Sequence, residues 1–583
     1  TPMVAFFPWR THRPTPGQVG RRPTCGVGGH CDDVGVSDPL ARFAPATRAW
    51  FRESLGEPTA AQAAAWSAPD DRHLLVVAPT GSGKTLAAFL SAIDGLLHRE
   101  PRAPDARPPG TSVLYVSPLK ALAVDVERNL RSPLVGISRT AAREGTSVVD
   151  VSVGIRSGDT PQQERRRLAT HPPDVLITTP ESLFLVLTSA ARESLRDVHT
   201  VIVDEVHAVA GTRRGAHLAL SLERLDALLE RPARRVGLSA TVRPAEEVAR
   251  FLGGGRPVET VAPASPRHLA LDVRVPVDDL TDIPAIDDDS PAGTIWPHVE
   301  RQVLDLVLAH RSTLVFVNSR GLAERLTSRL NEAWAERQGQ ARDPAADTRA
   351  PAQVSGGSNQ SRGVADPDGP EHLVARAHHG SVSKEQRALI EDDLKTGRLP
   401  CVVATSSLEL GIDMGAVDLV VQVGSPPTVA SGLQRVGRAG HQVGALSHGV
   451  LFPTSRTDLL GAAVTAERMM AGAIETLRVP TNPLDVLAQQ TVAACALDPV
   501  DVEEWFSTVR RSAPFATLPR RVYEAVLDLV SGRYPSEDFA ELRPRVVWDR
   551  DAGTLTGRPG AQRLAVTNGG TIPDRGMFSV VLP

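Results

Sequence analysis

Two neighbouring side chains, the Lys84 ammonium and the Thr85 hydroxyl, end a glycine-containing stretch that could hold a triphosphate. Apolar runs at 73–77 and 86–90 flank it, which predicts a buried strand, a loop and a helix start. Glycines let such a loop aim several N–H groups at one anion, towards which the positive end of the helix dipole also points. The lysine would reach the β- and γ-phosphates, and the threonine would ligate Mg²⁺. A turn that binds nothing is the alternative. The predicted nucleotide-binding residues are Pro79, Thr80, Gly81, Ser82, Gly83, Lys84 and Thr85.

Two adjacent carboxylates, Asp204 and Glu205, follow the apolar run 200–203. In a site that hydrolyses nucleotides, the first acid holds the metal ion and the second orients and deprotonates the attacking water. Adjacent acids can also be a solvated strand end. Because this pair follows a strand of the same predicted sheet as the lysine loop, we favour the catalytic interpretation, with Lys84, Asp204 and Glu205 as catalytic residues and Asp204 and Thr85 as metal ligands.

Small polar turns end three further predicted strands of this unit, at 112–116, 149–153 and 175–177. Strands that alternate with helices predict a parallel α/β sheet, and such sheets bind ligands at the carboxyl ends of their strands. Backbone N–H groups and hydroxyls at these ends suit phosphate oxygens of a nucleic-acid strand. Ordinary helix caps and turns are the alternative for each turn taken alone. The candidate contacts are Pro118, Lys120, Gly158, Asp159, Thr178, Thr179 and Pro180.

A second α/β unit has strands predicted at 313–317, 401–404 and 419–423 but no phosphate-binding loop. Instead it carries Arg435 and Arg438, which are three residues apart and therefore share one helical face. The first unit carries phosphate and metal groups, so these arginines could complete its site from across a cleft. A surface arginine pair would be the default interpretation without the first unit.

The composition limits the class of protein. A chain of 583 residues should form about three or four domains. A net charge of −4 gives no whole-protein signal for nucleic acid, so any such surface must be local. Four cysteines form no disulfide framework, and no second ligand pair accompanies Cys25, His30 and Cys31, so we expect a reducing, cytoplasmic setting and no structural metal. No stretch approaches 18 apolar residues, so we expect no membrane span.

Taken together, these stretches resemble superfamily 2 helicases over about residues 38–453. Four sequence motifs, at 117–122, 204–207, 434–441 and 482–489, resemble those of the bacterial Lhr, or large helicase-related, family. That resemblance implies two tandem RecA-like parallel-sheet domains with a cleft between them, followed by a winged-helix domain and a further C-terminal domain. The expected boundaries are 1–37 for a disordered tail, 38–260 and 261–453 for the RecA-like domains with a disordered insertion at about 335–370, 454–545 for the winged helix, and 546–583 for the start of the last domain.

The resemblance also implies an activity. The chain would be an ATP-dependent translocase that moves 3′ to 5′ on single-stranded DNA and unwinds DNA or RNA:DNA duplexes, in DNA repair and associated with the nucleoid. An ATP-gated clamp that grips without travelling, and an RNA-specific helicase, are the alternatives. Because the chain stops inside the apolar run 577–582, we expect a fragment that lacks most of the C-terminal domain.

The resemblance assigns roles to individual residues. Arg435 and Arg438 become arginine-finger candidates, Gln62 would read the adenine edge, and Gly411 and Asp413 would also contact the nucleotide. His207, Ser239, Thr241 and Gln434 would couple hydrolysis to movement. Polar strand ends of both units would grip the tracked strand. Its further candidate contacts are Asn318, Arg320, His379, Thr405 and Ile572.

Overall fold

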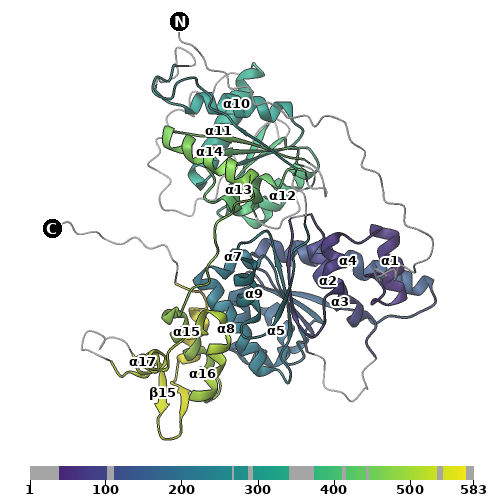
Figure 1. Cartoon of the computed structure of the whole chain (residues 1–583), viewed down its shortest axis with the longest axis vertical. Helices are drawn as coiled ribbons and strands as arrows, with labels where there is room; N and C mark the ends of the chain where they lie inside the picture. The colour runs from purple at the N-terminus through teal and green to yellow at the C-terminus, as the bar shows by residue number, and fades with distance from the viewer. Residues whose placement is uncertain are drawn as a thin grey trace, which may run out of the picture. The chain divides into compact units, whose positions relative to one another are not determined.

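The computed structural model describes residues 38–79, 81–100, 110–264, 268–285, 293–339, 373–409, 415, 417–440, 446–534 and 543–572 (Figure 1). From Pro39 on, the described residues belong to one compact unit. The expected tail at 1–37, most of the expected insertion at 335–370, and the apolar run 577–582 lie outside the described residues, as do Thr80, Gly411 and Asp413.

The first domain is built on a seven-stranded, all-parallel sheet in the order β3-β4-β2-β5-β6-β1-β7. Its central strands are mostly apolar and buried because helices cover both faces. The strands are β1 (His73–Val77), β2 (Val113–Val116), β3 (Val153–Arg156), β4 (Val175–Thr178), β5 (Thr200–Val203), β6 (Arg234–Ser239) and β7 (Val258–Val261).

Helices α1 to α4 cover one face of this sheet, and η1 with α6 to α9 covers the other (Figure 1). The helices are α1 (Pro45–Leu55), α2 (Ala60–Ser67), α3 (Lys84–Leu97), α4 (Lys120–Arg143), α5 (Gln162–Thr170), α6 (Pro180–Leu187), η1 (Ala190–Leu195), α7 (Val206–Ala210), α8 (Arg213–Leu228) and α9 (Ala245–Gly253). The strand predicted at 149–153 was wrong by about four residues. Val149 instead donates its N–H to Leu97 O at the end of α3.

The second domain holds a six-stranded parallel sheet in the order β10-β11-β9-β12-β13-β8. The stretch 255–294 is rich in Pro and Asp, which predicts a connection between domains, but it contains β7 and β8, which are edge strands of the two sheets. The elements are β8 (Leu269–Val273), α10 (Trp296–Ala309), β9 (Thr313–Phe316), α11 (Arg320–Arg337), β10 (Ala375–His378), α12 (Lys384–Lys395), β11 (Cys401–Ala404), η4 (Ser406–Leu408), β12 (Leu419–Val423), α13 (Val429–Val436), β13 (Ser447–Phe452) and α14 (Arg456–Met470).

The C-terminal part combines helices with a three-stranded antiparallel sheet, β14-β16-β15. Since β14 pairs with β16, the sheet continues past the boundary expected at residue 545. Residues 563–567, whose sequence Arg-Leu-Ala-Val-Thr predicts a short strand, instead belong to helix α18, which buries Ala561 and Ala565 one turn apart. The elements are α15 (Leu484–Ala494), β14 (Val500–Asp501), α16 (Val502–Arg511), η5 (Ala513–Phe515), α17 (Arg520–Ser531), β15 (Val546–Asp549), β16 (Thr554–Gly557) and α18 (Ala561–Thr567).

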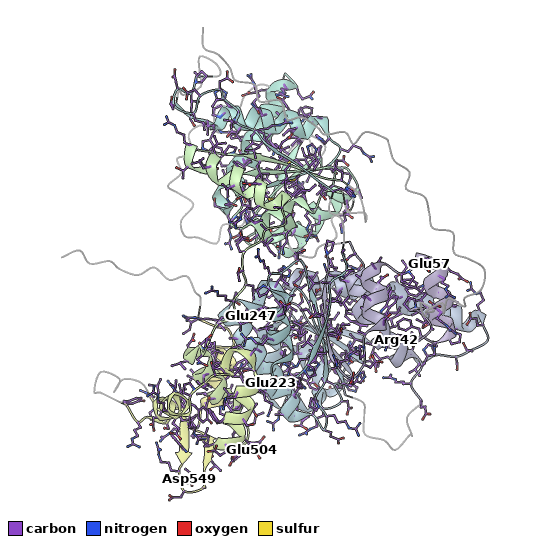
Figure 2. All side chains as sticks on the ribbon, in the orientation of Figure 1. Arg42, Glu57, Glu223, Glu247, Glu504 and Asp549 are labelled. Atoms are coloured by element: carbon purple, nitrogen blue, oxygen red, sulfur yellow. The ribbon has the colours of Figure 1, made fainter. Side chains whose placement is uncertain are left out.

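Helix α8 of the first domain packs against this C-terminal part. Leu220 is fully buried within the hydrophobic cluster of the C-terminal helices. Arg224 donates a hydrogen bond of 2.9 Å to Gln490 Oε1 on α15, and Arg511 Nε on α16 lies 3.2 Å from Glu223 Oε2. Figure 2 labels Glu223 on the side of the first domain next to these helices. Because buried apolar packing and partly buried hydrogen bonds act together here, they fix the C-terminal helices on the first domain.

A buried histidine on α8 gives a prediction on acid stability. Burial, with the Arg224 guanidinium adding to it, lowers the pKa of His217 to about 4. The unfolded chain binds this proton near pH 6.5, so between pH 6.5 and 4 the unfolded state holds more protons than the folded state. The free energy of unfolding should therefore fall by roughly 3 kcal/mol as the pH drops through this window, and the contribution of His217 is fully present above it.

Denaturant melts of the wild type and the His217→Gln variant between pH 7.5 and 4 measure how much His217 contributes to the loss of unfolding free energy on acidification. The variant should lose less stability on acidification than the wild type, since glutamine does not titrate. Parallel curves for the two proteins would show that His217 contributes nothing to the acid sensitivity.

Candidate functional site

The loop between β1 and α3 has the expected curled backbone. Gly81 and Gly83 have φ values of 81° and 79°, in the left-handed region that favours glycine. The Lys84 ammonium donates to the carbonyls of Ala78 and Pro79 within the same loop. Thr85 lies partly exposed in the first helical turn. The lysine and the N-terminal end of α3 therefore converge on one small volume, as an anion site requires.

Gln62 supports this loop. Thr59 and Gln62 form a capping box at the start of α2, in which Gln62 Oε1 accepts from the Thr59 N–H at 3.0 Å. Thr59 Oγ1 donates to Ser82 O at 2.8 Å, and a Cβ on Gly83 would lie 2.5 Å from Gln62 Nε2. The Thr-x-x-Gln spacing was a signal for this cap that the sequence analysis did not use. Adenine recognition by Gln62 stays a prediction.

The two acids follow β5 at the same sheet edge. Tyr115 on the neighbouring strand β2 donates its hydroxyl proton to Asp204 Oδ2, and Asp204 Oδ1 accepts from the Glu205 N–H at 2.8 Å. Burial raises the pKa of Asp204, and the Glu205 carboxylate adds to the shift. Sequence reasoning missed Tyr115, whose contact depends on the adjacency of β2 and β5.

The Glu205 backbone is held in an unfavourable conformation. Its φ of 44° lies in the left-handed region, which non-glycine residues seldom adopt. Such strain persists where the surroundings over-determine it, and it concentrates at functional sites. This backbone conformation lets Asp204 and Glu205 present their neighbouring carboxylates from a single turn.

His207, beside these acids, contacts residues of both domains. Burial, with the Lys84 ammonium adding to it, lowers the pKa of His207 to about 4, so its ring is neutral at pH 7. His207 Nδ1 accepts from the Ala240 N–H at 3.2 Å and lies 3.2 Å from Ser239 Oγ. On the other side of the ring, His207 Nε2 contacts Gln434 Nε2 on α13. Three of the four predicted coupling residues thus meet.

The fourth predicted coupling residue, Thr241, lies nearby. With Ala78 and Pro79 from the lysine loop, it lines a cavity of about 450 Å³ beside that loop.

Both predicted arginine fingers are buried on and beside α13. Arg435 Nε lies 2.9 Å from Glu409 Oε2, and Arg435 Nη1 donates to Gln422 Oε1 at 2.9 Å and to Asn318 Oδ1 at 3.1 Å. Arg438 Nη2 donates to the carbonyl of Glu409 at 2.8 Å. The structure thus anchors both arginines on Glu409, a partner that the sequence analysis missed. Their action on a nucleotide stays a prediction.

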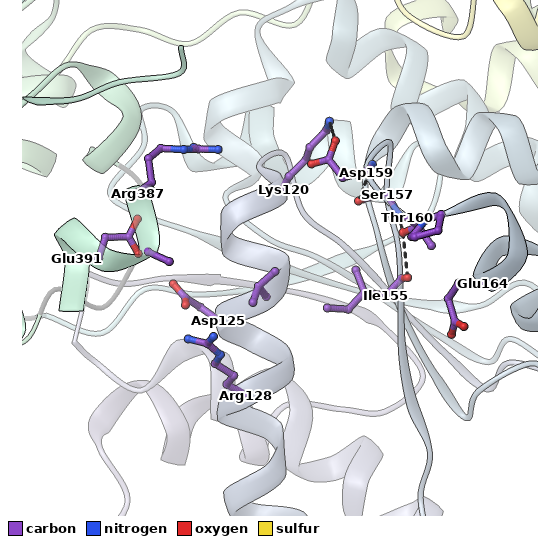
Figure 3. A pocket seen from close by; sticks show the side chains of 13 residues that line it. Lys120, Asp125, Arg128, Ile155, Ser157, Asp159, Thr160, Glu164, Arg387 and Glu391 are labelled. Carbon is purple, nitrogen blue, oxygen red and sulfur yellow. Dashed lines mark hydrogen bonds and ion pairs between the residues drawn. The ribbon is translucent and has the colours of Figure 1, made fainter. Parts of the chain in front are cut away.

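The predicted strand contacts of the first domain divide into exposed and buried groups. Lys120 and Asp159 are both about half exposed and form an ion pair of 2.6 Å at the mouth of a pocket of about 330 Å³ (Figure 3). Gly158 is exposed beside them, and a Cβ there would lie 3.1 Å from Lys120 Nζ. The buried members are Pro118, Thr178, Thr179 and Pro180.

Two of the buried members have structural partners. The Thr178 hydroxyl donates to Arg156 O at 2.8 Å, and the Thr179 side chain caps α6. In this structure these hydroxyls hold the sheet edge together, so any phosphate contact there would come from the backbone.

In the second domain, Asn318 and Arg320 are exposed at the end of β9, and Arg320 Nη1 donates to Ser381 Oγ at 2.8 Å. His379 is buried and contacts Glu324, and Thr405 is partly exposed after β11. Ile572 is 62% exposed. All five stay predicted strand contacts.

Gln489 fixes the turn that leads to Ile572. Its side-chain amide donates to Asn568 O at 2.6 Å and to Gly570 O at 2.8 Å.

Two negative findings accompany this site. No helix in the described part of the chain is long and apolar enough to cross a bilayer. In the same residues, no three His, Cys, Asp or Glu side chains gather as a metal-binding cluster.

Three family descriptions match successive parts of the chain. Residues 59–249 match the DEAD/DEAH box helicase, residues 368–442 match the helicase conserved C-terminal domain, and residues 467–583 match the winged helix domain of the large helicase-related protein. These matches cover strands β1 to β6 of the first sheet, β10 to β12 of the second sheet and the C-terminal helices, and they confirm the predicted fold class.

Individual proteins are similar over nearly the whole chain. The Lhr helicase/probable uracil glycosylase of Mycolicibacterium smegmatis is 66% identical over 94% of this chain, which spans 35% of that protein. The Lhr helicase/uracil glycosylase of Escherichia coli is 58% identical over 93% of this chain and 36% of its own length.

A solved structure agrees with these relatives. The structure of Mycobacterium smegmatis helicase Lhr bound to ssDNA and AMP-PNP matches with a TM-score of 0.80 and 63% identity, over 94% of this chain and 64% of that one. The chain spans about a third of the curated relatives' length. From the order of its two parallel sheets and winged helix, and from this identity along 94% of its residues, the chain belongs to the Lhr helicase family.

Proposed function

We propose that the chain is an ATP-hydrolysing motor that acts on DNA as a helicase. The observation that carries the proposal is the convergence of Lys84, Asp204 and Glu205 at the carboxyl edge of one parallel sheet. A relative at 63% identity was solved with ssDNA and AMP-PNP, a triphosphate analogue, and this supports the same two ligand classes here.

Mg²⁺ fits the residues present. Asp204 is a buried carboxylate whose pKa is raised by burial and by a second carboxylate, so a divalent cation would restore the charge balance there. The Asp204 carboxylate and the Thr85 hydroxyl are oxygen donors of the type this ion prefers. When bound, Mg²⁺ would neutralise charge on the phosphate oxygens.

The remaining chemistry belongs to the side chains. Lys84 would exchange the carbonyls of Ala78 and Pro79 for phosphate oxygens, which accept more strongly because they are charged. Glu205 would take the proton of the attacking water, and a guanidinium from the second domain would offset charge that builds on the transferred phosphoryl group.

Coupling to movement would run through His207. It contacts Ser239 in the first domain and Gln434 in the second, so its hydrogen bonds change when the domains open or close. Because the pKa of His207 is lowered to about 4, its imidazole stays neutral at pH 7 and can respond to such movement without titrating.

The finer activity is also a proposal. We infer movement from 3′ to 5′ along single-stranded DNA, unwinding of DNA or RNA:DNA duplexes, and a role in DNA repair from the likeness to the Lhr family. Residues of both domains that end strands beside the site would hold the tracked strand, so that each cycle advances it.

Duplexes with a 3′ or a 5′ single-stranded tail, each with a DNA or an RNA tracking strand, test these points. We expect ATPase stimulation by single-stranded DNA, and displacement of the shorter strand from 3′-tailed DNA only. ATP-dependent retention without displacement would favour a clamp, and displacement only from RNA tails would favour an RNA helicase. An ATPase that does not respond to nucleic acid would contradict the motor itself.

A further inference from the structure

The edge strand β3 ends in an arginine at the sheet edge where the strand contacts are predicted. Arg156 is the last residue of β3, which among the described strands pairs with β4 alone, in a register that sets Arg156 beside Thr178. The loop Ser157–Thr160 follows immediately and carries Gly158 and Asp159. Arg156 is therefore next to predicted nucleic-acid contacts on two sides.

A second arginine lies beside it. Arg165 on α5 donates from Nη2 to Gly158 O at 2.7 Å and to Ser157 O at 3.3 Å. Arg165 thus fixes the loop and brings a second positive charge to the end of β3. Burial, and after it the charge of Arg165, lowers the pKa of Arg156.

The acids near this loop are engaged by other cations. Asp159 pairs with Lys120 at 2.6 Å, and Glu164 lies 3.7 Å from Arg167. Among the residues that the structure describes, no acceptor lies within hydrogen-bond distance of the Arg156 guanidinium, although that side chain is only partly exposed.

Arg235, in the same domain, shows how a buried guanidinium with a structural role is paired. Arg235 is 1% exposed, and it pairs with Glu223 at 2.8 Å and with Asp226 at 2.6 Å. A buried charge is costly unless it is paired. Arg156, by contrast, is partly exposed and has no carboxylate partner among the described residues, so its charge is available to an anion from outside the chain.

We propose that Arg156, supported by Arg165, binds a backbone phosphate of the single strand at the end of β3. The proposal rests on the proposed function and adds a strand contact to it. A guanidinium can hold two phosphate oxygens at once, which a lysine ammonium does not do in a fixed geometry. Phosphate contacts position a strand without reading its sequence, so the contact should not depend on base composition.

The test measures binding of a fluorescent single-stranded oligonucleotide by anisotropy at several salt concentrations. Arg156→Gln should weaken binding roughly tenfold at low salt. It should also reduce the slope of log affinity against log salt by about 0.7, the value for one phosphate contact on a single strand. Arg156→Lys should keep the slope and lose part of the affinity.

Arg167→Gln is the matched control, because Arg167 is an exposed arginine on the same helix as Arg165. It should keep the wild-type slope. Thermal melts separate binding from folding: Arg156→Gln should melt at or above the wild-type temperature, since it removes a charge without a partner.

An unchanged salt slope in Arg156→Gln would overturn the proposal, and so would a melting temperature that falls in both Arg156 variants while their slopes stay at the wild-type value. Absence of oligonucleotide binding by the wild-type chain would instead contradict the proposed function. The two failures are therefore distinguishable.

Discussion

Replacing Glu205 with glutamine should lower ATP turnover by about 10²–10⁴-fold, the usual contribution of a positioned base, while nucleotide binding is retained. Glutamine keeps the size and the hydrogen-bonding ability of the side chain but cannot accept the proton of the attacking water. The loss of one carboxylate also relieves repulsion on Asp204, whose pKa Glu205 raises. Nucleotide affinity should therefore stay equal or become tighter.

Steady-state phosphate release with saturating single-stranded DNA measures the loss, and a fluorescent nucleotide analogue measures binding. Glu144→Gln is a suitable control, since Glu144 is an exposed acid at the end of α4. Rapid hydrolysis by Glu205→Gln, with unchanged binding, would mean that another group activates the water.

Local signals fixed the elements that carry the nucleotide site. The apolar run 73–77 coincides with β1, and the helix start at Lys84 was predicted from the same motif. Each of these predictions needed only residues that are neighbours in the sequence. Two strands near the domain boundary were missed, because β7 and β8 are edge strands with partly exposed, mixed sequences in a Pro- and Asp-rich stretch.

In helix α18 the error is the reverse, because a strand is predicted from the sequence where the structure has a helix. Its short apolar run 564–566 predicts a strand, yet Ala561, in the C-terminal core, and Ala565, packed with Ala493 and Phe184, are both buried one helical turn apart. A segment of this length satisfies both periodicities, so only packing against α15 decides between them.

Partners within the site depend on tertiary pairing, which the sequence does not carry. The contact between Tyr115 and Asp204 exists because β2 and β5 are neighbours in the sheet, although 89 positions separate the two residues. Arg435 and Asn318 are 117 positions apart and still share a hydrogen bond. Residue types at the strand ends were therefore predictable, whereas their mutual contacts were not.

That hydrogen-bond network determines how the arginine finger must be tested. Arg435 is 2% exposed and bonds Glu409, Gln422 and Asn318. Arg435→Ala would remove the partner of the Glu409 carboxylate and of Gln422 Oε1, and breaking a buried ion pair costs about 3–5 kcal/mol. Lost activity in that variant could then reflect unfolding of the second domain rather than a missing charge at the phosphate.

The double variant Arg435→Gln/Glu409→Gln separates the two effects, because it removes both charges and leaves amides that can bond each other. We expect ATP turnover to fall by about 10³–10⁵-fold, as for loss of an arginine finger, while nucleotide affinity and melting temperature stay close to the wild type. Glu409→Gln alone should keep or increase turnover, since it frees Arg435 from the carboxylate that competes with phosphate for its guanidinium. Near-wild-type turnover in the double variant would limit Arg435 to holding Glu409 in place and would leave Arg438 as the remaining finger candidate.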